Sequence, residues 1–279
     1  MNADLHCHST TSDGWLTPTE VVRRAAANGV TVLALTDHDE VGGLDEAIAA
    51  AAEAGIRLVP GVEISVSFRD ETVHIVGLGI DHRNPVLLAG LDVVRAGRDG
   101  RAVRIGAELD AVGIHGALEG ARRFARNPAL VSRAHFARHL VASGVMPDVS
   151  TVFRHYLARG KPGYVEHQWA ALEDAVGWIR AAGGIAVIAH PARYRYSEAD
   201  MDALFDRFVA CGGEGVEVVS GAHTDAEMLR FASVARRRGL LASRASDFHG
   251  EKESPVDLGG GAPLPPDLVP VWTRLPSPG

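Results

Sequence analysis

ADLHCHSTTSDGW, residues 3–15, places two histidines and two aspartates close to the first residue of the chain. Along a β-strand, side chains two positions apart point to the same face. A strand over residues 3–8 would therefore turn Asp4, His6 and His8 to one side and the apolar residues between them to the other. Two imidazoles with this spacing, followed by further carboxylates, are a pattern that suits a bound metal ion.

Six further apolar runs repeat the strand pattern along the chain: TVLALT (31–36), RLVPGVE (57–63), VHIVGLG (73–79), IAVIAH (185–190), GVEVVS (215–220) and LLASRAS (240–246). Helical patterns separate most of these runs, which is typical of βαβ units and a mostly parallel sheet. Seven strands favour an α/β barrel or a strongly curled sheet.

The helices between the runs carry recognisable end signals. In residues 17–29, Thr17 is the expected N-cap, Pro18 occupies the first helical position, Glu20 completes a capping box and Gly29 follows the end. Similar helices are predicted over residues 43–55, 172–184 and 224–239.

The alternation divides the chain into three parts. Residues 1–80 and 170–250 contain the predicted strands and form the expected barrel. Residues 81–169 show helical patterns without a convincing strand, which predicts an inserted helical subdomain. Residues 251–279 are rich in Pro and Gly and are expected to form an extended tail.

Composition narrows the classes of function. A formal net charge of −7 argues against binding of long duplex nucleic acid, which depends on an extended basic surface, but allows a small phosphorylated ligand. No apolar run has the length of a membrane span, and two cysteines suit a reducing compartment. We therefore expect a cytoplasmic protein with no membrane association and no evident obligate protein partner.

The ends of the predicted strands carry the residues with the strongest chemical character. Nine candidate metal ligands gather there: His6, His8, Asp13, His38, Glu63, His74, His190, Asp247 and His249. In parallel α/β folds the carboxyl ends of the strands form the active face. Nine donors exceed the needs of one ion, so two or three divalent ions are expected, and the lack of thiolate favours Mn²⁺, Fe²⁺ or Zn²⁺.

The same motifs resemble a known family. HCHSTTSDG (6–14), TDHD (36–39), GVE (61–63), VHIVG (73–77), AHP (189–191) and SDFH (246–249), in this order, are similar to the successive motifs of the PHP (polymerase and histidinol phosphatase) family of metal-dependent phosphoesterases. The resemblance implies a distorted (β/α)7 barrel with a trinuclear centre that often holds manganese. Ala245 is a small departure, because many relatives have Gly there.

The resemblance also implies how the ligands divide among the ions. His6, His8 and Asp247 would surround one ion, and Asp13, His38 and His249 a second. His74 and His190 would hold a third, with Glu63 bridging two of the three. Asp4, Asp37 and Asp39 either cap turns or orient these histidines.

Three stretches, residues 132–140, 160–179 and 219–224, look similar to the bacterial branch that acts on nucleoside 3′,5′-bisphosphates and trims short RNA from the 5′ end. This similarity implies a small nucleotide or short RNA as substrate. A substrate with a second phosphate needs a separate anion site, and arginine binds phosphate through paired hydrogen bonds. The candidate substrate-binding residues are Arg98, Arg101, Ser132, Arg133, His135 and Lys161.

His223 is the candidate catalytic residue, because it follows a strand end and can protonate a leaving oxygen. Each charged residue of the insertion can also simply be a solvated surface group. Two other functions remain open: a phosphatase for another monoester such as histidinol phosphate, and a non-catalytic, metal-stabilised binding module.

Overall fold

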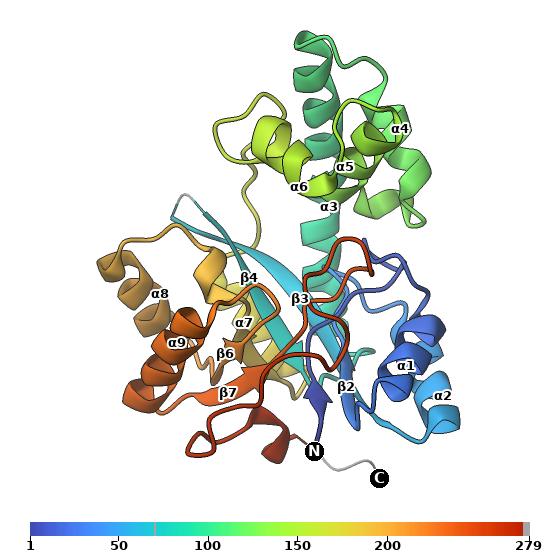
Figure 1. Cartoon of the computed structure of the whole chain (residues 1–279). Helices are drawn as coiled ribbons and strands as arrows, with labels where there is room; N and C mark the ends of the chain where they lie inside the picture. The colour runs from blue at the N-terminus through green and yellow to red at the C-terminus, as the bar shows by residue number, and fades with distance from the viewer. Residues whose placement is uncertain (70, 276–279) are drawn as a thin grey trace.

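A computed structural model describes residues 1–69 and 71–275 of the chain (Figure 1). One seven-stranded sheet runs in the order β1 to β7, and every predicted strand is present. The strands are β1 (Ala3–Asp4), β2 (Val32–Leu35), β3 (Arg57–Phe68), β4 (Glu71–Leu78), β5 (Ile185–Ile188), β6 (Gly215–Val219) and β7 (Leu241–Arg244). The α/β class and the strongly curled sheet are confirmed.

The two edges of the sheet meet at a seam, where residues 5–8 lie beside residues 244–248. The backbone N–H of Leu5 donates to Arg244 O at 3.0 Å, Asp247 N–H donates to His6 O at 2.9 Å, and His8 N–H donates to Phe248 O at 2.9 Å. These bonds bring the sheet to a nearly closed barrel.

Strand β4 is the exception to the parallel arrangement. It pairs antiparallel with both β3 and β5, whereas the other neighbouring strands are parallel. Strand β3 continues into β4 without a helix between them, so this part of the barrel departs from a regular βα repeat. Because β4 runs in the opposite direction, His74 near its start reaches the edge where the parallel strands end.

Five helices cover the outside of the barrel: α1 (Pro18–Ala27), α2 (Leu44–Ala54), α7 (Leu172–Ala181), α8 (Glu198–Ala210) and α9 (Asp225–Arg238) (Figure 1). The predicted end signals of α1 are confirmed, because Thr17 and Glu20 form a reciprocal capping box and Gly29 has a φ of +76°. Helix α8 was absent from the sequence prediction, although Ser197 caps its start.

The first strand is shorter than predicted, and the prediction that Asp4 shares a face with His6 and His8 is wrong. The carboxylate of Asp4 accepts hydrogen bonds from the backbone N–H groups of Ser246, at 2.9 Å, and Gly259, at 2.7 Å. The regular strand ends at Asp4, so the strict alternation of side chains ends there too.

The C-terminal segment closes the end of the barrel away from the strand ends that carry the candidate ligands. Val271 and Leu275 pack with Leu5 and Val32 in a buried cluster inside the barrel. Pro270 also bridges to Ala242 beside β7. The segment is irregular, with turns at residues 251–253, 258–259 and 266–267 and one 3-10 turn, η4 (Val271–Thr273). Apolar side chains near its end belong to the core.

Residues 81–169 contain α3 (Pro85–Ala111), α4 (Ala117–Phe124), the 3-10 turn η1 (Pro128–Leu130), α5 (Arg133–Ala142), α6 (Val149–Val152) and the π-helical turn η2 (Phe153–Leu157). The start of α3 packs on α7, where Gly90 leaves room for Trp178. The rest of α3 rises from the barrel and carries the smaller helices (Figure 1). These helices share a hydrophobic core of their own, which includes Ile105, Leu109, Phe136 and Leu140.

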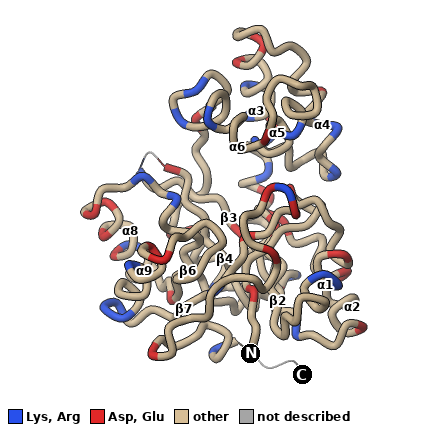
Figure 2. The backbone as a smooth tube through the Cα atoms, viewed as in Figure 1, with Lys and Arg blue, Asp and Glu red and all other residues tan. Residues whose placement is uncertain are grey.

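Charged residues lie close together where this helical part meets the barrel (Figure 2). None of the helices in the described part of the chain is long and apolar enough to cross a membrane.

Candidate metal centre

The seam of the barrel brings the first pair of histidines together with two carboxylates. His6 Nε2 lies 3.1 Å from His8 Nε2, and Glu63 Oε2 lies 3.2 Å and 3.4 Å from these two nitrogens. Asp247 Oδ1 is 3.3 Å from His8 Nε2 and 3.6 Å from His6 Nε2. Four donor atoms from distant parts of the sequence therefore converge on one buried point.

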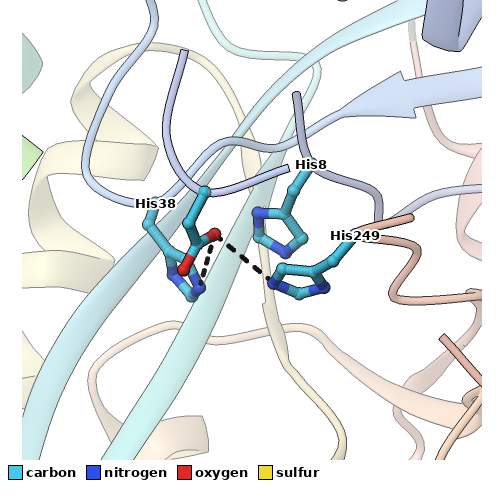
Figure 3. Close-up of side chains that lie close together, drawn as sticks. His8, His38 and His249 are labelled. Carbon is cyan, nitrogen blue, oxygen red and sulfur yellow. Dashed lines mark ion pairs between the residues drawn. The ribbon is translucent and has the colours of Figure 1, made fainter. Parts of the chain in front are cut away.

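A second group of donors lies beside the first. The carboxylate of Asp13 faces His38 Nε2 at 3.8 Å and His249 Nε2 at 3.4 Å, and Figure 3 marks both ion pairs. The ring of His8 stacks on the ring of His38 and on that of His249, with centroid distances of 4.5 Å and 4.0 Å. Asp13 comes from the loop after β1, so this loop supplies a ligand candidate opposite the ends of β2 and β7.

Glu63, in the middle of β3, touches both remaining histidines. Its Oε1 lies 2.8 Å from His74 Nδ1 and 3.0 Å from His190 Nε2, and its Oε2 lies 2.8 Å from His38 Nδ1. Burial alone raises the pKa of the Glu63 carboxyl, but the surrounding imidazoles, His38 first, hold that pKa well below its usual range. Glu63 is therefore a fully buried carboxylate at the centre of the cluster.

The donor atoms are better arranged to bind divalent cations than to form hydrogen bonds with one another. Buried side-chain atoms without a hydrogen-bond partner among the described residues include His8 Nδ1, Asp13 Oδ1, His190 Nδ1 and Asp247 Oδ1. Leaving such atoms unsatisfied costs several kcal/mol. Around an ion with ligands at about 2.1 Å, neighbouring ligand atoms lie roughly 3 to 3.4 Å apart, as they do here.

All nine predicted ligands belong to four overlapping groups that can each hold an ion: His8, Asp13, His38 and His249; His6, Glu63 and His190; His6, His8 and Asp247; and His38, Glu63 and His74. His74 and His190 contact the same oxygen of Glu63 but fall in different groups. Neither cysteine contributes, because Cys7 Sγ–H donates to Ala34 O and Cys211 Sγ–H donates to Phe208 O.

Sequence reasoning missed Glu217, a buried carboxylate on β6 that orients two of the ligand candidates. Its Oε1 lies 2.6 Å from His6 Nδ1, and its Oε2 accepts from the backbone N–H of His190 at 2.7 Å. A carboxylate behind a metal-binding histidine fixes the ring and its tautomer. The only sequence signal was an acidic residue within the apolar run GVEVVS.

The backbone is strained at this edge. Three residues have positive φ angles: Asp39 (52°), His190 (27°) and Asp247 (54°). Residues other than glycine rarely adopt this backbone conformation. Such strain persists where the surrounding structure fixes the residue, and it concentrates at functional sites. Asp39 is held by Ser65, whose backbone N–H donates to its carboxylate at 2.7 Å.

A cavity of about 280 Å³ opens above the donor cluster and joins it to the insertion. Asp13, His38, His74, Asp247 and His249 line one side. Arg98, Arg101, Arg133 and Trp169 line another. Figure 2 shows basic residues of the insertion close to the acidic residues of the barrel loops at this junction. One cavity therefore combines a candidate cation site with a cluster of guanidinium groups.

The three arginines of this cavity, named here the arginine wall, differ in their partners. Arg98 pairs with Asp39 and lies over the ring of Trp169. Arg101 and Arg133 have no carboxylate within ion-pair distance among the described residues; each donates to a backbone carbonyl. Burial, followed by the neighbouring Arg133 and Arg98, lowers the pKa of Arg101 to about 9. A bound anion would relieve this mutual repulsion.

The other predicted substrate residues occupy different positions. Ser132 lines the cavity, and its hydroxyl donates to Asp13 Oδ2 at 2.9 Å. His135 is buried behind it and accepts from the backbone N–H of Ser132 at 3.0 Å. Lys161 is exposed and is not among the lining residues. Arg193, which the sequence analysis did not consider, lines the cavity and pairs with Asp247 at 2.6 Å.

His223 lies outside the lining of this cavity. Its Nδ1 is 3.1 Å from Val218 O, its Nε2 faces the backbone N–H of Ala192 at 3.4 Å, and its ring stacks on Phe231. Both ring nitrogens therefore have backbone partners when Nδ1 carries the proton. The arrangement favours a part in holding the loop after β6 over contact with a substrate.

The family model of the PHP domain matches residues 4–211. The chain is 57% identical over 274 residues to the 3′,5′-nucleoside bisphosphate phosphatase of Chromobacterium violaceum, covering 98% of this chain and 96% of that protein. It is 41% identical over 272 residues to the 5′-3′ exoribonuclease Rnm of Escherichia coli, covering 96% of this chain and 92% of that protein.

A solved structure is similar over nearly the whole fold. It is described as an amidohydrolase from Chromobacterium violaceum with bound sulfate and no metal, and it is 56% identical with a TM-score of 0.95, covering 98% of this chain and 95% of that one. Together with the ordered motifs and the nine converging donors, these similarities show that the chain belongs to the PHP domain family.

Proposed function

We propose that this chain is a metal-dependent phosphoesterase that removes the 3′-phosphate from nucleoside 3′,5′-bisphosphates and also trims short RNA from its 5′ end. The observation that carries the proposal is one cavity with two regions that can bind a phosphate. These regions are the donor cluster, once it holds metal ions, and the arginine wall. A nucleotide with two phosphates can fill both regions at once. The similarity to a 3′,5′-nucleoside bisphosphate phosphatase and to a 5′-3′ exoribonuclease supports the same substrate class.

We propose that two or three divalent ions, Mn²⁺ first and Fe²⁺ or Zn²⁺ as alternatives, bind the nine donors of the cluster. Two of the expected sets, His6 with His8 and Asp247, and Asp13 with His38 and His249, lie within groups of the structure. The expected third pair, His74 and His190, falls in two different groups that share Glu63. When bound, such ions neutralise charge on phosphoryl oxygens and lower the pKa of water. An all-nitrogen and oxygen donor set suits these hard or borderline metals.

Other residues of the cavity are assigned to binding the two phosphates and to holding a ligand candidate in place. Arg101 and Arg133 lack carboxylate partners, so we assign them to the 5′-phosphate, which is not cleaved. Arg193, beside Asp247, is placed to donate to oxygens of the phosphate that is cleaved. Ser132 holds Asp13 in position from the start of α5.

One bond cleavage accounts for both activities. Water adds its hydroxyl to phosphorus, the bond between phosphorus and O3′ breaks, and the proton from water ends on O3′. With a bisphosphate the product is inorganic phosphate. With an oligonucleotide the phosphate stays on the 5′ carbon of the second nucleoside, which recreates a 5′-phosphate for the arginine wall.

The proposal is tested by phosphate release from adenosine 3′,5′-bisphosphate, adenosine 3′-monophosphate and histidinol phosphate, using protein loaded with Mn²⁺ and assayed for metal content. We expect the bisphosphate to be the best substrate. In Arg101→Ala the KM for the bisphosphate should rise by about tenfold or more, because a charge-assisted contact is lost, while the KM for the monophosphate changes little.

Arg104→Ala is the matched control, since Arg104 is exposed one turn further along α3 and is not among the cavity residues. Faster release from histidinol phosphate than from the bisphosphate would replace the proposed substrate with another monoester. No release from any of the three by metal-loaded protein would instead support a binding module.

A further inference from the structure

A second cavity, of about 600 Å³, lies beside the first. We name it the aromatic cavity. Its lining comes from the loop after β1, from α4, α5 and the start of α6, and from the loop after β7, which reaches up beside α3 (Figure 1). Val149 and Glu253 line both cavities, so the two share a wall. Ligand pockets commonly have volumes of roughly 300–1,000 Å³ and mostly apolar walls.

Trp15 supplies a partly exposed aromatic ring to the lining of the aromatic cavity. Its side chain is 48% exposed although both its backbone and its ring are held in place. The backbone N–H donates to His249 O at 2.8 Å, and the indole N–H donates to Glu253 Oε1 at 2.6 Å. Phe124 presents its ring edge-on, with centroids 6.4 Å apart. The Arg138 guanidinium lies over the indole ring, 4.7 Å from its centroid, so a flat aromatic ligand would pack on the part of the ring that stays exposed.

The aromatic cavity starts close to the donor cluster. Trp15 is two residues from Asp13, and Gly250 directly follows His249, so about 7 Å of chain separates ligand candidates from the cavity lining. On the side of the arginine wall, the first cavity is lined by the buried side chains of Arg98 and Trp169. A substrate longer than one nucleotide thus has room to continue on the side of Asp13 and His249.

Among the described residues that line the aromatic cavity, two side chains are basic, and they differ in their partners. Arg138 is neutralised by Glu253 through two contacts of 2.8 Å. Asp148 caps α6 by accepting from Thr151 at 2.7 Å. Lys252 is exposed and has no ion pair among the described residues. A ligand with an aromatic ring and a nearby phosphate matches this combination.

We propose that the aromatic cavity binds the nucleoside that follows the cleaved phosphate in an oligonucleotide, with its base packed against Trp15 and Phe124 and its next phosphate near Lys252. This inference rests on the proposed function, since it names where the second residue of the RNA substrate lies. A bisphosphate has no second nucleoside and leaves the aromatic cavity unused.

The test compares a 5′-phosphorylated adenosine dinucleotide with adenosine 3′,5′-bisphosphate in wild type, Trp15→Ala and Phe124→Ala, each loaded with Mn²⁺. Stacking of a base on an aromatic side chain is lost in both variants, so kcat/KM for the dinucleotide should fall about tenfold relative to kcat/KM for the bisphosphate. Phe124 lies on α4 and is not a ligand candidate, so Phe124→Ala leaves the sequence of the loop that carries Asp13 and Trp15 unchanged.

Two controls separate stacking from general damage. Leu229→Ala removes an apolar side chain that is 68% exposed on α9, and it should leave the ratio of the two activities at the wild-type value. A dinucleotide with an abasic second residue should be a poorer substrate for wild type, whereas Trp15→Ala should cleave it as well as it cleaves the intact dinucleotide.

The outcomes distinguish this inference from the proposed function. Equal losses on both substrates, or no loss on either, overturn the assignment of the aromatic cavity. Wild-type protein that hydrolyses the bisphosphate but not the dinucleotide also overturns it and leaves the phosphatase proposal standing. Wild-type protein that hydrolyses neither rejects the proposed function and this inference together.

Discussion

At the scale of single residues, the cluster depends on side chains that do not face the cavity. Glu217 joins the ring of His6 to the backbone of His190 and so orients two ligand candidates through one carboxylate. Burial raises the pKa of this carboxyl, but the charge and hydrogen bond of His6, together with those of His190, lower it overall. Glu217 therefore acts as an anion that keeps Nδ1–H of His6 toward itself and Nε2 toward the cluster.

Glu217→Gln should lower the affinity for divalent metal by about 10- to 100-fold, because the amide cannot replace the carboxylate behind His6. Turnover at saturating metal should fall much less. Calorimetric titration of metal-free protein with Mn²⁺ measures the affinity. Glu214→Gln is the matched control, since Glu214 is exposed just before β6. Wild-type affinity in Glu217→Gln would show that the ring of His6 is held by its other contacts.

At the scale of elements, α5 connects the insertion to the donor cluster. Its N-cap Ser132 donates to the side chain of Asp13, and Arg138 two turns later donates to the backbone oxygen of Asp13 at 2.5 Å. Arg138 also pairs with Glu253 in the loop after β7. One helix of the insertion thus positions a ligand candidate and both loops that border the seam.

The start of α5 should make stability depend on pH through His135. Burial lowers the pKa of His135 to about 4, below the unfolded value of 6.5. The unfolded chain therefore binds more protons between these two values. The stabilisation is fully present above pH 6.5 and is lost as the pH falls toward 4. Protonation would also remove the nitrogen that accepts from Ser132 N–H.

His135→Gln tests this dependence, because glutamine at this position of a capping box can accept the same hydrogen bond but does not titrate. Between pH 7 and pH 5 the wild-type free energy of unfolding should fall by about 2 kcal/mol more than that of the variant. Urea denaturation at the two pH values measures this difference. His115→Gln, at an exposed position of the insertion, should behave like wild type. Parallel loss in His135→Gln and wild type would contradict the assignment.

At the scale of the whole molecule, the donor cluster spans the seam of the barrel. The seam is held by few backbone hydrogen bonds, and β1 has only two residues. His6 and His8 lie on one side of the seam, and Asp247 and His249 lie on the other. The insertion has a separate hydrophobic core and does not depend on the seam for its packing.

Removal of metal should therefore loosen the seam before it loosens the insertion. After chelation, hydrogen exchange should accelerate at residues 5–14 and 245–250, because ligand bonds across the seam are lost and like-charged donors repel. Amides in α4 and in the middle of α5 should keep most of their protection, since their core is separate. Exchange measured by mass spectrometry on metal-loaded and chelated protein makes the comparison. Equal changes in both regions would show that the molecule opens as one unit.

Local patterns in the sequence determined most helices and strands of this protein and the set of side chains that can bind metal. The capping box of α1 and the seven apolar runs depend on neighbours within a few residues, so they can be recognised along the chain. The ordered motifs likewise indicated the family and the nine ligand candidates. Helix α8 was not predicted, although Ser197 caps its start.

Tertiary structure alone decided which residues meet. The reversed direction of β4 brings His74 to the edge of the parallel strands, the early end of β1 turns Asp4 away, and closure of the barrel places Glu217 behind His6. The aromatic cavity likewise joins Trp15 with Phe124 and Glu253, which are more than a hundred residues apart. These encounters depend on strand direction, barrel closure and the docking of α5. Such long-range packing leaves no periodic signal in the sequence.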